Sequence, residues 1–109
     1  MKWMEPFYTG DIEASEIEGM KKEAEECDMR LYGTRAIIVL PYNKNNLFEI
    51  MSFHQLTIPY YKTLDLKAVA FARDKQDAEN VLCRIIEDME KAGKGFKVDE
   101  FFKIKKAGE

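Results

Sequence analysis

The run of five apolar residues from Ala36 to Leu40 constrains the fold more than any other part of the sequence. Its two isoleucines and its valine are β-branched, and Pro41 ends it, so the run is typical of a short β-strand. A strand with one face in water alternates apolar and polar residues, and this run does not alternate. We therefore predict a strand that is covered on both faces.

Residues 66–98 predict a strand, a helix and a further strand. Lys67–Ala72 is a short apolar run that suits a buried strand. Asp74 follows it and can accept hydrogen bonds from the first free amides of a helix. Apolar residues then recur at helical spacing from Ala78 to Met89, and two glycines end the helix before a strand restarts at Phe96–Val98.

The N-terminal third predicts a similar order. Trp3–Tyr8 is an aromatic-rich strand candidate, and Ser15 with Glu18 forms a capping box at the start of a helix. The apolar stripe of that helix consists of Ile17, Met20, Ala24 and Cys27. The rest of it is strongly acidic: residues 1–29 carry nine acidic and three basic side chains.

Together these elements predict one α+β domain over residues 1–109, with an inserted helix at about 46–57. Without the insertion the order is a ferredoxin-like split β-α-β sheet (βαβ-α-βαβ), in which the strands are antiparallel and both helices share one face. Because the strand at residues 36–40 needs cover on its other face as well, we expect the insertion, a second copy of the chain, or both, to supply it.

Composition narrows the function without identifying it. A net charge of −3 over 109 residues argues against a general polyanion binder. The two cysteines, Cys27 and Cys83, do not form a disulfide framework, so we expect reduced thiols and a cytoplasmic protein. The first ten residues lack the apolar core of a secretion signal, and no apolar run is long enough to span a membrane.

In the predicted topology the loops fall at two ends of the sheet. Thr9–Asp11 and residues 42–46 should share one end, and Arg30, Arg35 and Arg73 the other. Within the first end, the segment before the inserted helix consists of Asn43, Lys44, Asn45 and Asn46. Free amides at a helix N-terminus beside a lysine attract anions, so we predict a small anionic ligand here.

Tyr60 and Tyr61 complete the predicted ligand-binding residues, because aromatic hydroxyls near a lysine can bind a polar group. His54 is the only histidine, so a multi-histidine metal site is excluded, and no oriented partner for a general base is visible. We predict no catalytic residue, no metal and no cofactor. A small enzyme that uses His54 with Tyr60 or Tyr61 is the less favoured alternative.

Two segments resemble the RNA-recognition domains. Phe7–Ile12 resembles their first conserved strand, and Lys67–Ala72 followed by Asp77–Glu79 resembles their third strand and second helix. The resemblance implies that bases would stack on Tyr8 and Phe71. Nucleic-acid binding is therefore a second alternative. The leading prediction is a non-catalytic ligand-binding or protein-interaction module that dimerises through a sheet face or edge.

Overall fold

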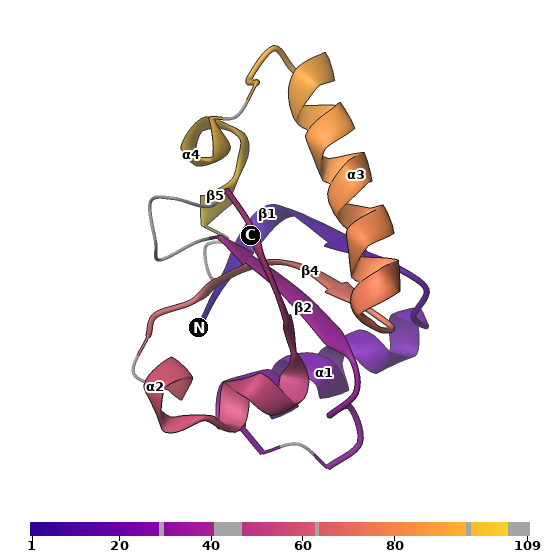
Figure 1. Cartoon of the computed structure of the whole chain (residues 1–109), viewed down its shortest axis with the longest axis vertical. Helices are drawn as coiled ribbons and strands as arrows, with labels where there is room; N and C mark the ends of the chain where they lie inside the picture. Colours follow the sequence, from indigo (N-terminus) through magenta and orange to yellow (C-terminus); the bar gives the residue numbers. More distant parts are fainter. Residues whose placement is uncertain (29, 41–46, 63, 96, 105–109) are drawn as a thin grey trace.

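The computed structural model describes residues 1–28, 30–40, 47–62, 64–95 and 97–104, and these form an α+β structure around an open mixed sheet (Figure 1). The strand order in the described part of the chain is β3-β2-β4-β1-β5. The strands are β1 (Lys2–Thr9), β2 (Ala36–Leu40), β3 (Glu49–Ser52), β4 (Lys67–Ala72) and β5 (Lys103–Ile104). The helices are α1 (Ile17–Glu26), α2 (Pro59–Lys62), α3 (Lys75–Lys91) and α4 (Val98–Phe101), with 3₁₀ turns η1 (Ala14–Glu16) and η2 (Phe53–Thr57).

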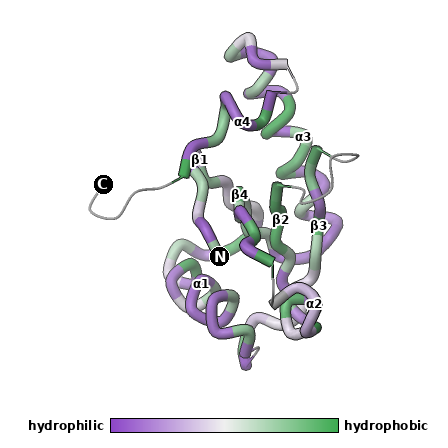
Figure 2. The backbone as a smooth tube through the Cα atoms, turned by 90° about the vertical axis from the view of Figure 1, so that its left-hand side faces the viewer, coloured by the Kyte–Doolittle hydropathy of each residue, from purple (hydrophilic) through white to green (hydrophobic). Residues whose placement is uncertain are grey.

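Strand β2 is buried on both faces, as its composition predicts. Ala36, Ile38 and Leu40 face the helix α3, and Ile37 and Val39 face α1 and η2. All five side chains are at most 6% exposed in the single chain. Strand β2 is hydrophobic along its whole length, whereas α1 is largely hydrophilic (Figure 2). Both faces of the sheet centre are thus closed by the chain itself.

The ferredoxin-like arrangement is not confirmed. The central neighbours β1 and β4 run parallel, whereas the split β-α-β sheet is antiparallel throughout. The two long helices also lie on opposite faces: α1 packs Met20 and Ala24 with Ile37, and α3 packs Val81 and Ile85 with Ile38. A central strand that is apolar on both sides needs a covering element on each face, and α1 and α3 cover one face each.

The inserted helix predicted at 46–57 is wrong over most of its length. Residues 49–52 form β3, which pairs antiparallel with β2, and only 53–57 are helical, as the 3₁₀ turn η2. Ile50 packs on the α3 side of the sheet, while Met51 and Phe53 pack on the α1 side. Apolar residues on both faces suit a strand beside β2. The same residues also fit helical spacing, which is why the sequence predicted a helix here.

The strand predicted to restart at Phe96–Val98 is also wrong for its described part. Val98 begins α4 instead of a strand. Phe102 follows the helix, and its side chain is only 2% exposed and belongs to the core on the α3 side of the sheet. The last strand, β5, comes later and pairs antiparallel with Met4 and Glu5 of β1.

Candidate functional site

The predicted anion site, Asn43 to Asn46, lies outside the described residues. The other two predicted ligand residues lie on α2. The rings of Tyr60 and Tyr61 meet edge to face, with centroids 5.4 Å apart. Tyr60 is 56% exposed, whereas Tyr61 packs against the α1-side core and lines a small cavity of about 80 Å³. Ligand binding by these tyrosines stays a prediction.

His54 is exposed on η2, and it supports the backbone of the neighbouring loop. Its amide donates to the carbonyl of Gly33 at 3.2 Å, and its ring lies so close to Gly33 that a β-carbon there would overlap it. His54 is absent from the described lining of the Tyr61 cavity. This placement gives no support to the alternative in which His54 and Tyr61 share a catalytic pocket.

Of the two aromatic residues of the RNA-recognition resemblance, Phe71 is covered and Tyr8 is half-buried. Phe71 is fully buried and meets the rings of Trp3, Phe7 and Phe53 edge to face at centroid distances of 5.0–5.5 Å. The Tyr8 hydroxyl donates to Asp88 of α3 at 2.6 Å. Burial first, and this carboxylate second, raise the pKa of Tyr8. Because Phe71 is enclosed by other rings, it is not placed to stack on a base, whereas base stacking on Tyr8 stays a prediction.

The predicted separation of loops is wrong. Since β1 and β4 are parallel, Thr9–Asp11 lies beside Arg73, and Arg73 pairs with Asp11 at 2.5 Å. One carboxylate oxygen of Asp77 accepts the amides of Asp11 and Arg73, at 2.7 and 2.9 Å. Asp74 caps α3 by accepting the amide of Asp77, and this bond holds the pKa of Asp74 below its usual value.

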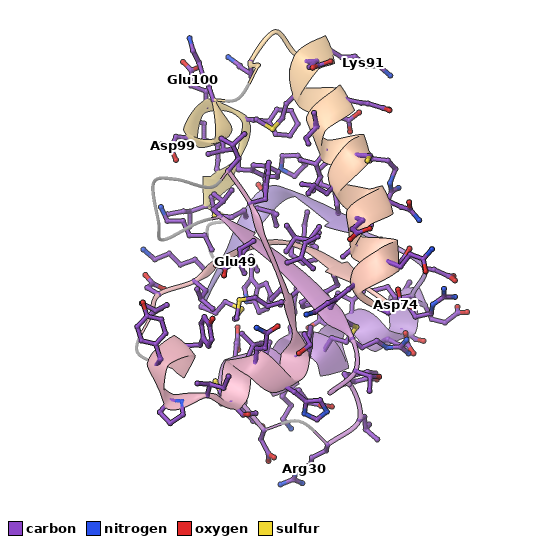
Figure 3. The ribbon with its side chains drawn as sticks, viewed as in Figure 1. Arg30, Glu49, Asp74, Lys91, Asp99 and Glu100 are labelled. Carbon is purple, nitrogen blue, oxygen red and sulfur yellow. The ribbon has the colours of Figure 1, made fainter. Side chains whose placement is uncertain are left out.

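The three arginines do not form a basic cluster, because each pairs with a different carboxylate. Arg30 pairs with Asp28 at 3.0 Å and Arg35 with Glu16 at 2.8 Å. Figure 3 shows Arg30 at one tip of the molecule, well away from Asp74, the residue after Arg73. These positions are therefore neutralised within the chain and offer no concentrated positive charge.

A site that the sequence did not predict is built around Glu23. This residue is only 8% exposed, and its carboxylate accepts the amides of three consecutive residues: Arg30 at 2.9 Å, Leu31 at 3.0 Å and Tyr32 at 3.1 Å. Helix α1 ends just before, at Glu26, and the next residue, Cys27, takes a left-handed φ of 53°. Glu23 thus fixes the returning chain, whose described residues 30–32 pair with no strand.

Beside this anchor lies a hollow of about 660 Å³ between α1 and the returning chain. We name it the Leu31 surface, and its lining includes Gly19, Lys22, Glu26, Arg30, Leu31 and Tyr32. Gly19 is in contact with the Tyr32 ring, which a side chain at position 19 would push away. Leu31 is 78% exposed, the highest value among the large exposed hydrophobic residues of the described chain.

Two features of the sequence point weakly to this surface. Gly19 interrupts an otherwise helix-favouring segment, and Leu31-Tyr32-Gly33 has the composition of a turn. Local sequence patterns do not predict the pairing of Glu23 with amides seven to nine residues later, because that pairing depends on the path of the loop.

A scan against protein-family models, a search of curated proteins and a search of solved structures each gave no match to this chain. Among the described residues, the helices are too short or too polar to cross a membrane. The same part of the chain contains no group of three or more His, Cys, Asp or Glu side chains placed to hold a metal ion.

Proposed function

We propose that this chain is a non-catalytic protein-interaction module and that the Leu31 surface is its contact surface. The observation that carries the proposal is the buried Glu23 carboxylate, which anchors a loop that holds Leu31 out in water. Burial of a carboxylate is unfavourable unless its hydrogen bonds are satisfied, and here three amides satisfy it. The chain thus uses a buried charge to support an exposed apolar side chain.

An exposed leucine contributes little to the stability of the isolated chain. Covering it in a complex is worth about 1.5–3 kcal/mol. Anchoring the loop in advance lowers the ordering cost of association, which is the usual benefit of a rigid contact surface. Leu31 also shares the lining of the hollow with the charged residues Lys22, Glu26 and Arg30, a combination of apolar and charged groups that protein interfaces use as centre and rim.

The two cysteines are free, and Cys83 is exposed. Free thiols support the expectation that the module works in a reducing compartment.

Photocrosslinking from position 31 tests the proposal. A photoreactive amino acid replaces Leu31 in one variant and Ile104, an apolar residue that is 46% exposed on β5, in a matched control. In cells that make the protein, we expect a discrete adduct from position 31 that excess wild-type protein competes away. The Leu31→Ser variant should compete poorly. An adduct pattern at position 31 no stronger than at position 104 would contradict the proposal.

A further inference from the structure

We infer that the partner at the Leu31 surface is a second copy of this chain, a step that rests on the proposed function. The surface carries both a projecting side chain, Leu31, and the hollow beside it. A twofold axis places the same patch of each copy against itself, so one patch must offer both halves of every contact. A leucine next to a hollow meets this requirement, because each Leu31 can enter the other copy's hollow.

The charges of the surface meet the same requirement. Lys22 and Glu26 are exposed, one helical turn apart, on the side of α1 that lines the hollow. Within the described chain neither belongs to an ion pair. A lysine four residues before a glutamate is also the less favourable orientation for a pair within one helix.

Two α1 helices that pack antiparallel around a twofold axis would give both Lys22 and Glu26 a partner of opposite charge. Centred between positions 22 and 26, which are about 6 Å apart along the helix, the axis sets Lys22 of each copy opposite Glu26 of the other. The rest of the rim does not oppose such contact, since Asp28 and Arg30 already pair at 3.0 Å and Glu23 is satisfied by amides. The patch is therefore close to neutral in an acidic chain.

This geometry replaces the predicted contact through the sheet. The sheet centre is covered on both faces, so a second copy has no apolar face to close there. The outer strand β3 is only four residues long, and the amide of Ser52 at its end already donates to the side chain of Gln55 at 2.8 Å. An edge-to-edge dimer would have few free backbone groups to use.

Charge reversal tests the inference. The full chain is studied by sedimentation equilibrium over a wide concentration range, as wild type, Lys22→Glu, Glu26→Lys and the double variant. Each single reversal sets like charges opposite each other twice per dimer, so we expect the dimer Kd to rise about tenfold or more. The double variant restores both pairs and should return the Kd to within about threefold of wild type.

A matched control exists on α3, where Lys75 and Glu79 are exposed with the same spacing and order. Reversing both should leave the dimer Kd unchanged. Urea unfolding of every variant shows whether the fold is intact.

The outcomes separate the two proposals. A dimer that the single reversals do not weaken, or that the double variant does not restore, overturns the inference. A chain that stays monomeric while position 31 crosslinks to another protein also overturns it but leaves the interaction module standing. A monomer without a specific crosslink overturns both.

Discussion

Single buried polar groups hold together the parts of this chain that have no regular structure. Glu23 takes the place of a neighbouring strand for Arg30, Leu31 and Tyr32, and the half-buried pair of Arg35 with Glu16 ties the start of β2 to the start of α1. Such groups are effective because a buried amide without an acceptor is costly, so the loop has one favourable path.

Glu23→Ala should lower the free energy of unfolding by about 2–3 kcal/mol, because three amides lose a charged acceptor inside the protein. Amide exchange at residues 30–32 should accelerate along with it. Glu79→Ala is the matched control at an exposed position of α3, away from the Leu31 surface, and it should change stability by less than about 0.5 kcal/mol. Equal effects of the two substitutions in urea unfolding would show that Glu23 does not anchor the loop.

Tyr8→Phe should make the alkaline loss of stability smaller. The pKa of Tyr8 is raised in the folded chain, so the folded state favours the neutral phenol. That preference stabilises the protein fully below the unfolded pKa near 10 and is lost as the pH rises from there toward the folded value. We expect Tyr8→Phe to cost about 1–2 kcal/mol at neutral pH through the lost bond to Asp88, and less above pH 10.

Urea unfolding of both proteins from pH 7 to pH 11 measures this difference. A gap between wild type and Tyr8→Phe that stays constant or widens above pH 10 would show that the phenol does not carry the effect.

At the scale of elements, the parallel ends of β1 and β4 are joined to the start of α3 through Asp77. Its carboxylate lies so close to Gly10 that a β-carbon at position 10 would overlap it, while the same group accepts the amides of Asp11 and Arg73. Glycine at position 10 is therefore required by packing, and no positive φ is involved.

Gly10→Ala should destabilise the protein by about 1–3 kcal/mol, since the added methyl group displaces Asp77 from its two amides. In an Asp77→Ala background the same change should cost much less, because the atoms in its way are gone. A double-mutant cycle measured by urea unfolding gives the coupling between the two residues. Additive effects would place the strain of Gly10→Ala somewhere other than at Asp77.

The elements themselves differ in how far the sequence predicted them. Strands β2 and β4 and helix α3 follow from local patterns: unbroken apolar runs, a capping aspartate and a stripe of period 3.6. Strand β3 does not, because Ile50, Met51 and Phe53 fit helical spacing as well as a strand with both faces covered. The direction of β1 against β4 is a property of the chain path, which periodicity does not contain.

The candidate site was harder to predict than the fold for a related reason. Judged from its neighbours in the sequence alone, Leu31 is a turn residue and Glu23 is one of many glutamates on an acidic helix face. Only the folded chain shows that the carboxylate points inward to amides and that the leucine is left in water.

For the molecule as a whole, the sheet lies between two cores that share its central strands. One core contains α3 and Phe102, the other contains α1, η2 and Phe71. A substitution in either core therefore acts on the strands that both depend on, and it should lower the stability of the entire sheet.

Phe71→Ala decides whether this ring is a core residue or a base-stacking residue. The side chain is 0% exposed and touches three other aromatic rings, so we expect its removal to cost about 3–5 kcal/mol in urea unfolding. That is a large fraction of the 5–15 kcal/mol typical of a whole domain, so the variant should be partly unfolded at moderate temperature. Leu31→Ala, compared with wild type at protein concentrations below the dimer Kd, removes an exposed apolar side chain and should cost less than about 0.5 kcal/mol. The opposite result would be a Phe71→Ala protein that is as stable as the wild type but has lost a salt-sensitive binding of oligonucleotides. Because a buried ring cannot be removed without loss of stability, that result would place Phe71 on a nucleic-acid-binding surface.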